Sequence, residues 1–250
     1  MPDRFVSPAL QGMDITSFLT VPLAGVEAEI YNGIWNAVID RKLQSGMKLE
    51  EAALGEIYGV SRTVIRKVLV IMEQDGIVEL PLNRGAYVAS PSREDGLQVL
   101  EAASVLYQHF ARKLALNPKG LTDQDRERIQ LHLQAEERAH NEQKVQASRR
   151  MRSELGTLLG LLSGNALLAG TMARYMVRAI LALSLHQKGP APDSRALGKT
   201  IVDAISKGDA EKAVETIRIY SALLMQSMNL VMDDHTADLR SILGHAAKPR

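Results

Sequence analysis

The stretch that decides the fold is residues 59–88, GVSRTVIRKVLVIMEQDGIVELPLNRGAYV. Ser61 is a favourable helix N-cap, and the apolar residues after it recur at helical spacing until a glycine interrupts them. Two short β-type runs, residues 77–80 and 86–89, follow and are separated by a turn that contains Pro, Asn and Gly. The stretch therefore predicts a helix over residues 61–75 followed by a β-hairpin.

Two further helices precede this stretch. The apolar side chains of residues 26–41 follow helical spacing, and residues 51–58 form a short helix that Gly59 ends. Three helices and a hairpin within about 65 residues are typical of a winged helix-turn-helix domain. We place this domain at residues 26–90.

The remainder of the chain is predicted to be helical. Beyond Pro91 the breaks in the pattern divide the sequence into about six helices, enough for a bundle of their own. The fold class we expect is mostly α, with an N-terminal winged helix-turn-helix plus a C-terminal antiparallel helical bundle. The bundle is assigned to residues 91–235, a flexible N-terminal arm to residues 1–25 and a polar tail to residues 236–250.

The composition excludes several classes of protein. The 250 residues are 46% hydrophobic and 24% charged, which is enough for packed cores, and the net charge of +1 excludes a broadly basic nucleic-acid coat. The absence of cysteine excludes disulfide scaffolds, thiol nucleophiles and thiolate zinc sites. No apolar run approaches the roughly 20 residues of a membrane span, and the N-terminus is a poor secretion signal. We expect a cytoplasmic protein with no membrane partner.

The predicted helix at 61–75 has a polar, basic face at its N-terminal end. Arg62 and Arg66 are one helical turn apart, so both guanidinium groups project to the same side, where each suits a bidentate contact with guanine. Ser61, Thr63 and the helix N-terminus suit phosphate oxygens. The residues that we expect to contact double-stranded DNA are Ser61, Arg62, Thr63, Arg66, Lys67, Arg84 and Gly85.

An ordinary solvated helix face is the alternative interpretation of this basic cluster. The DNA interpretation is favoured because Arg84 and Gly85 stand at the tip of the predicted wing. Residues 26–90 as a whole are not basic, with seven Lys and Arg against nine Asp and Glu. Binding should therefore depend on a focused contact that dimerisation doubles.

Three ordered motifs carry a family resemblance. They are Gly59-Val60-Ser61-Arg62-Thr63 with Arg66, then Asp75-Gly76-Ile77-Val78, then Asn83-Arg84-Gly85-Ala86-Tyr87-Val88. With these motifs, residues 26–90 resemble the DNA-binding domain of the GntR family of bacterial transcription regulators. The resemblance implies phosphate and base contacts from the polar residues of the first motif, and a wing glycine, Gly85, in the minor groove.

Two positions depart from the family pattern. Ala52 stands where many members have a DNA-contacting arginine, and Val64 replaces a frequent proline. The first departure puts the usual operator sequence of the family in doubt for this chain.

Two shorter motifs in the C-terminal half carry a second resemblance. They are Leu161-Leu162-Ser163-Gly164-Asn165 and the stretch from Ile201 to Ala210, IVDAISKGDA, in which Gly208 ends one helix and Asp209 begins the next. With them the C-terminal half resembles the FadR-type all-helical effector domain, the FCD class. The two resemblances together cover about residues 26–232.

Many members of the FCD class hold a divalent metal with one Asp and three His. The register of the resemblance puts Arg152 at the Asp position and Gly156, Gly198 and Tyr220 at the three His positions. Glycine has no side chain and arginine is a cation, and the six histidines of the chain show no ligand spacing. We predict that the metal site has been lost and that the protein has no cofactor.

The altered positions suggest a different ligand in the same bundle. Arg152 would bind an anionic group of a small-molecule effector, and Tyr220 would supply a hydroxyl. Gly156 and Gly198 would leave space for a bulkier ligand, and His109 could face the same cavity. The alternative is that Arg152 extends to solvent and apolar residues fill the cavity.

The sequence contains no motif of an activated nucleophile, phosphate loop or metal triad, so an enzyme is the weakest hypothesis. The leading hypothesis is a ligand-responsive transcription regulator that binds a pseudo-palindromic operator as a homodimer. An alternative is a DNA-binding regulator whose helical domain has lost small-molecule sensing and serves only dimerisation. A helical domain used purely for protein interaction ranks last, because it leaves the basic helix and wing unexplained.

Overall fold

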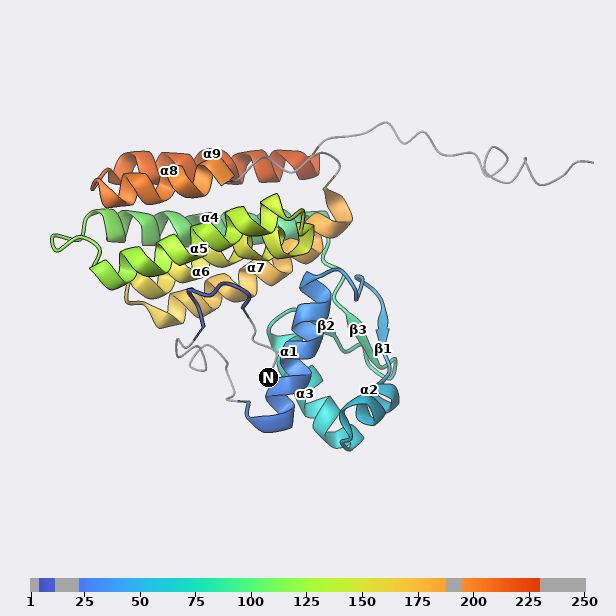
Figure 1. Ribbon diagram of the computed structural model, residues 1–250. Helices are drawn as coiled ribbons and strands as arrows, with labels where there is room; N and C mark the ends of the chain where they lie inside the picture. The colour runs from blue at the N-terminus through green and yellow to red at the C-terminus, as the bar shows by residue number, and fades with distance from the viewer. Residues whose placement is uncertain (1–4, 12–22, 188–194, 230–250) are drawn as a thin grey trace, which may run out of the picture.

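The computed structural model describes residues 5–11, 23–187 and 195–229. A smaller N-terminal domain lies beside one end of a larger helical bundle (Figure 1). The predicted fold class is confirmed for these residues, which form a winged helix-turn-helix followed by helices.

The N-terminal domain combines three helices with a small antiparallel sheet. Its helices are α1 (Gly25–Ile39), α2 (Glu51–Tyr58) and α3 (Arg62–Gln74), and its strands are β1 (Lys48–Leu49), β2 (Val78–Glu79) and β3 (Ala86–Val88). The strand order is β1-β3-β2, so β2 and β3 form the predicted hairpin. The sequence does not predict β1, because two residues are too few to display a period-2 pattern.

An apolar core fixes the orientation of α3 in this domain. Ile65, Leu69 and Met72 of α3 are fully buried, and they share one core with Tyr31 and Trp35 of α1. The two aromatic rings stack with centroids 5.9 Å apart. Burying each of these apolar side chains stabilises the fold by about 1.5–3 kcal/mol, so α3 has a defined inner face and leaves its opposite face to solvent.

The bundle consists of the six predicted helices within the described residues. They are α4 (Arg93–Ala115), α5 (Asp123–Asn141), α6 (Val145–Leu162), α7 (Ala166–His186), α8 (Arg195–Ser206) and α9 (Ala210–Asn229). Capping boxes begin two of them: Ser92 with Asp95 at α4, and Thr122 with Asp125 at α5. The helices lie side by side in layers (Figure 1), with Phe110 among the largest side chains of their core.

Helix α7 joins the bundle to the N-terminal domain. Its 21 residues are long and apolar enough to cross a membrane by length and composition alone, contrary to the expectation that no apolar run approaches the length of a membrane span. In the fold α7 packs against α4 and α6, and Val177 and Leu181 extend the core of the N-terminal domain. The core position of this helix accounts for its apolar character.

Polar contacts reinforce the same junction. Arg150 of α6 donates a hydrogen bond of 2.8 Å from Nη2 to Oδ1 of Asn36 in α1, and its Nη1 lies 3.7 Å from Oδ1 of Asp40. The guanidinium is buried, so these contacts are little screened by solvent. The two domains therefore meet through a packed, hydrogen-bonded interface.

The prediction of a flexible N-terminal arm is wrong for residues 5–11. Phe5 and Leu10 are buried in the core of the bundle, and the backbone N–H groups of Val6 and Ser7 donate to the Glu154 carboxylate at 3.0 and 2.7 Å. Apolar burial and two charge-assisted hydrogen bonds offset the entropy of ordering this segment. The rest of the predicted arm (1–4 and 12–22) and the predicted tail (236–250) lie outside the described residues.

Candidate nucleic-acid interface and ligand cavity

The N-terminal end of α3 is exposed and polar. Ser61 occupies the N-cap position with extended backbone angles (φ −70°, ψ 156°), but its side chain makes no capping hydrogen bond. Arg62 and Thr63 follow it on the exposed surface. The helix N-terminus presents unsatisfied N–H groups and a positive dipole end, so this position suits an anionic phosphate oxygen.

The next basic residues of α3 are engaged in ion pairs. Lys67 Nζ lies 2.8 Å from both carboxylate oxygens of Glu27 on α1, and Arg66 Nη1 lies 3.7 Å from Oε1 of Glu51 on α2. The side chains of Arg66 and Lys67 are 72% and 53% exposed, so both pairs are weak and exchangeable. Their Glu partners nevertheless lower the positive potential of this face, which makes Arg62 its principal cation.

The wing presents a second exposed cation. Arg84 and Gly85 lie in the turn between β2 and β3, where Asn83 and Gly85 adopt left-handed backbone angles (φ 59° and 86°). The β1–β3 pairing brings Lys48 beside this wing, with its Cε 3.7 Å from the position of a Cβ on Gly85. No sequence pattern reveals the place of Lys48, because it depends on the two-residue strand β1.

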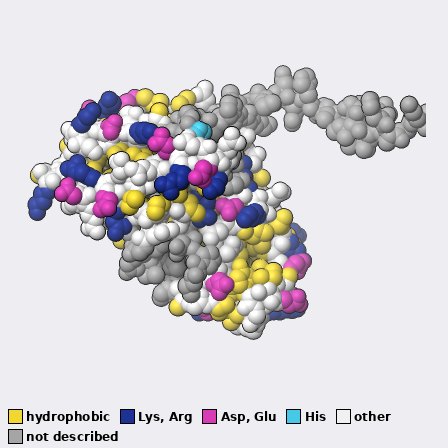
Figure 2. Space-filling model, viewed as in Figure 1, with side chains coloured by type: hydrophobic (Ala, Val, Ile, Leu, Met, Phe, Trp, Pro, Cys, Tyr) yellow, Lys and Arg dark blue, Asp and Glu magenta, His cyan; other side chains and the backbone are white. Residues whose placement is uncertain are grey.

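Figure 2 shows Lys and Arg side chains interspersed with Asp and Glu over the bundle, and residues 26–90 contain seven Lys and Arg against nine Asp and Glu. A focused contact by α3 and the wing fits this distribution better than non-specific coating of DNA.

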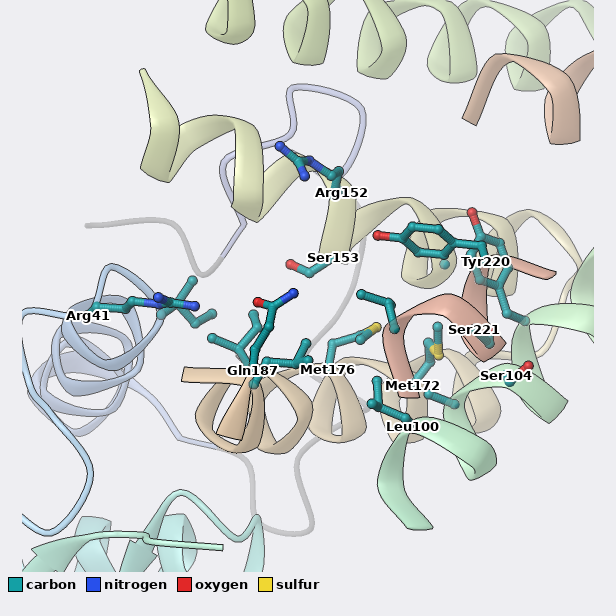
Figure 3. Close-up of a pocket in the computed structure, with 17 residues that line it drawn as sticks. Arg41, Leu100, Ser104, Arg152, Ser153, Met172, Met176, Gln187, Tyr220 and Ser221 are labelled. Atoms are coloured by element: carbon teal, nitrogen blue, oxygen red, sulfur yellow. The ribbon is translucent and has the colours of Figure 1, made fainter. Parts of the chain in front are cut away.

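The bundle contains a cavity of about 140 Å³ that reaches the N-terminal domain. Its walls are largely apolar, with methionine and leucine side chains from α4, α7 and α9, and Arg41, Arg152, Gln187 and Tyr220 are among its polar groups (Figure 3). Of the five predicted effector residues, the cavity brings together Arg152, Gly156 and Tyr220. Such a chamber with a few convergent polar groups is the usual form of a small-molecule site.

The other two predicted residues lie elsewhere. His109 is exposed on α4 beside the ring of Phe110 and does not line the cavity. Gly198 is buried against Leu155 and Leu133, so the space next to it is already filled. Helical register alone could not predict either result, because it does not specify which way each helix faces in the bundle.

Gly156 lines the cavity but adds little room to it. A Cβ placed on Gly156 would collide with the methyl group of Met172, so the thioether side chain of Met172 occupies the space beside the glycine. Methionine is flexible and can repack around a ligand. The expected extra space at this position therefore depends on movement of Met172.

Arg152 has an acidic neighbour inside the protein. Its Nε lies 3.9 Å from Oε1 of the buried Glu136 on α5, and its Nη2 donates to Ser148 Oγ at 3.2 Å. The side chain is 26% exposed, so it neither extends fully to solvent nor stands alone in the cavity. Glu136 thus supplies negative charge on the side of the cavity where the sequence analysis expects an anion to bind.

Burial also affects the phenol that neighbours these groups. Tyr107 lines the cavity, and its burial raises the pKa of the phenol far above its usual value, with the nearby Tyr220 and Glu136 acting in the same direction. Tyr107 therefore remains a neutral hydroxyl that can donate or accept a hydrogen bond. No sequence motif distinguishes this residue from other helical tyrosines.

The positions of the family metal site do not fit a divalent cation. Arg152, Gly156, Gly198 and Tyr220 offer no carboxylate or imidazole, and the described residues contain no group of three His, Cys, Asp or Glu that could hold an ion. Glu136 is the nearby carboxylate, and it faces the Arg152 guanidinium. Loss of the metal remains a prediction, which metal analysis of the purified protein would test.

Two family models match the sequence in the order of the two domains. The model described as "Bacterial regulatory proteins, gntR family" matches residues 27–88, and the FCD domain model matches residues 98–222, half of the chain. The chain belongs to the GntR family. It is a DNA-binding transcription regulator with an FCD domain, and it belongs with regulators rather than enzymes.

Solved structures agree with this GntR-family fold. A putative transcriptional regulator GntR from Rhodococcus sp. RHA1 has a TM-score of 0.71 and 18% identity over 82% of this chain and 98% of its own. E. coli McbR/YncC has a TM-score of 0.66 and 18% identity over 82% of this chain and 99% of its own. No curated protein matches the sequence significantly. At these identities the similarities support the shared fold alone.

Proposed function

We propose that this GntR-family regulator binds a pseudo-palindromic operator as a homodimer in the cytoplasm, and that a small anionic effector in the bundle cavity alters operator affinity. The observation that carries the DNA part is the exposure of Ser61, Arg62 and Thr63 at the N-terminus of α3, together with the exposure of the wing cation Arg84. One copy offers few cations of this kind. Two copies on two half-sites double the contacts, which is how helix-turn-helix proteins reach specific affinity.

The cavity supports the effector part of the proposal. Its volume of about 140 Å³ is close to the roughly 150 Å³ that holds a benzene-sized ligand in an apolar protein core. It also touches residues at the end of α1, so that a bound molecule contacts both domains. A ligand that binds one arrangement of the domains more tightly shifts the equilibrium toward that arrangement.

A second candidate is a regulator whose bundle serves dimerisation only. The pairing of Arg152 with Glu136 and the filling of the Gly156 site by Met172 favour this alternative. A thermal-shift screen of metabolites separates the two candidates. A ligand of the native state raises the melting temperature by mass action, whereas a bundle without sensing gives no response.

The DNA proposal is tested by fluorescence anisotropy with duplex DNA from upstream of the protein's own gene. Replacing Arg62 and Arg66 together by alanine should weaken binding at least about 30-fold, because each bidentate base contact contributes about 1–3 kcal/mol. The matched control replaces two exposed bundle arginines, Arg126 and Arg218, and should leave the affinity within about twofold. Intact operator binding by the Arg62→Ala/Arg66→Ala variant would overturn the assignment of α3.

A further inference from the structure

The N-terminal segment, residues 5–11, is held on the bundle through its main chain. Two consecutive backbone N–H groups of the segment donate to the Glu154 carboxylate of α6 at 3.0 and 2.7 Å. The Ala9 carbonyl oxygen accepts a hydrogen bond of 2.9 Å from Nη1 of Arg128 on α5. Figure 1 shows the segment, in dark blue, against the bundle. The bundle therefore contacts this stretch of chain in the way that a receptor holds the backbone of a bound peptide.

The bundle also contacts particular side chains of the segment. Phe5 and Leu10 are buried with 5% and 1% of their surface exposed, whereas Pro8 between them is exposed to solvent. The Ser7 hydroxyl is buried, with its Oγ 2.8 Å from Nδ1 of the buried His132 on α5. Main-chain hydrogen bonds give affinity for a peptide, and pockets for its side chains give specificity. Both kinds of contact are present here.

Phe5 brings the segment to the junction of the two domains. It lines a void of about 10 Å³ together with Trp35 and Ile39 of α1 and Val177 of α7. This volume is about that of a single water probe, so the side chains around the void are closely packed. Phe5 therefore takes part in the packing of the DNA-binding domain against the bundle.

Polar contacts connect the segment to α1 as well. The Glu154 carboxylate, which accepts the two backbone N–H groups, has its Oε1 3.9 Å from Nε of Arg150. The same guanidinium contacts Asn36 and Asp40 at the end of α1. Both charged side chains are buried, so solvent screens their interactions little. Glu154 thus holds the segment directly and contacts α1 through Arg150.

We propose that residues 5–11 are a built-in peptide ligand, which holds the DNA-binding domain on the bundle in one orientation and thereby raises operator affinity. The site that receives this peptide consists of Arg128, His132 and Glu154. A domain that is already held in its binding orientation loses less freedom when DNA binds, so its affinity is higher. The inference goes beyond the proposed function and rests on it only where operator affinity is measured.

The first test removes both apolar anchors of the segment in the full-length variant Phe5→Ala/Leu10→Ala. Amide hydrogen exchange should become at least about fivefold faster in residues 36–39 of α1 and 173–180 of α7, but not in α9, because the segment contacts only the former junction. The operator Kd should increase at least about threefold. The control Pro8→Ala/Gln11→Ala changes two exposed positions of the same segment and should behave like the wild type.

A second control separates this role from a general loss of stability. Ile205 is buried in the bundle core on α8, so Ile205→Ala removes a core side chain that does not belong to the segment or to the junction. This variant should also melt at a lower temperature than the wild type. Its exchange in residues 36–39 should nevertheless remain at the wild-type rate.

The second test supplies the segment as a separate molecule. The acetylated and amidated peptide FVSPALQ, residues 5–11, is added to the Phe5→Ala/Leu10→Ala protein. It should restore slow exchange in residues 36–39, whereas a peptide of the same composition in scrambled order should not. The peptide with alanine in place of serine should bind at least about threefold more weakly, because it lacks the hydroxyl that contacts His132.

Four results would overturn the inference. They are wild-type exchange in residues 36–39 of Phe5→Ala/Leu10→Ala, equal acceleration there by Ile205→Ala, no restoration by the peptide, and an operator Kd of the anchor variant equal to that of a wild type that binds. If unlabelled wild-type protein slows exchange in isotope-labelled variant, the segment binds a second copy, which contradicts the assignment within one chain. Exchange and peptide binding are measured without DNA. Failure of the wild type to bind its operator therefore counts against the proposed function alone.

Discussion

At the scale of single residues, two buried titratable side chains lie where residues 5–11 meet the bundle, and burial shifts the pKa of each. Burial raises the pKa of Glu154 to about 7, against the opposing effect of the backbone N–H groups of Val6 and Ser7 and of the Arg150 charge. Burial lowers the pKa of His132 to about 4. Ser7 connects the two, because its N–H donates to Glu154 and its Oγ lies 2.8 Å from Nδ1 of His132.

These two residues predict opposite dependences of stability on pH. The folded pKa of Glu154 is raised above the ordinary 4.5, so its contribution to the free energy of unfolding is full below pH 4.5 and is lost as the pH rises to about 7. The folded pKa of His132 is lowered from 6.5, so its contribution is full above pH 6.5 and is lost as the pH falls to about 4. Between pH 4.5 and 6.5 the two effects cancel in the wild-type protein.

Single substitutions should reveal each effect in urea denaturation measured across this pH range. The free energy of unfolding of Glu154→Gln minus that of the wild type should increase with pH by up to about 1.4 kcal/mol per pH unit. The reason is that only His132 of the two groups still titrates in this variant. His132→Gln should show the reverse slope. Glu137→Gln, at an exposed carboxyl of α5, is the control and should leave the profile unchanged. If the free energy of unfolding depends on pH in the same way in the wild type and all three variants, the burial of Glu154 and His132 is contradicted.

At the scale of secondary-structure elements, residues 5–11 act as an additional element of the bundle core. Leu10 is 1% exposed in that core, while its neighbour Pro8 is exposed to solvent. Leu10→Ala should lower the free energy of unfolding by about 2–5 kcal/mol, the usual cost of removing a buried leucine side chain. Pro8→Ala, two residues away, should change it by less than about 0.5 kcal/mol. Equal, small effects in chemical denaturation would mean that the segment does not pack as described.

The contrast between elements explains what the sequence could predict. Helix α3 and the wing are predictable because local patterns define them: an N-cap, helical spacing of apolar residues, and turn residues between two β-type runs. Residues 5–11 carry no such pattern, since their order depends on Glu154, almost 150 residues away in the chain. The residues of the candidate site also divide into those placed by a local pattern and those placed by tertiary packing. Arg62 follows from its helix, but the place of Tyr107 at the cavity depends on how the bundle helices pack.

At the scale of the whole molecule, Asp75 connects the recognition helix to both of its neighbours. It is the C-cap residue of α3 and is buried, with Oδ2 accepting a 2.5 Å hydrogen bond from the Tyr31 hydroxyl of α1. Its Oδ1 lies 3.8 Å from Nε of Arg174 on α7, and the Arg178 side chain of the same helix packs against Gly76. Both arginines of α7 therefore lie at the domain interface.

The Asp75–Arg174 contact predicts how firmly the DNA-binding domain is held on the bundle. Arg174→Ala leaves the buried carboxylate without its interdomain cation, so amide hydrogen exchange should become several-fold faster in residues 71–77 and in α7, but not in α9. Tyr31→Phe is the matched comparison, because it removes a hydrogen bond to the same carboxylate from within the N-terminal domain. It should lower the free energy of unfolding by about 1–2 kcal/mol without a change in exchange along α7. If α7 exchanges at the wild-type rate in Arg174→Ala, apolar packing through Val177 and Leu181 holds the domains together without this ion pair.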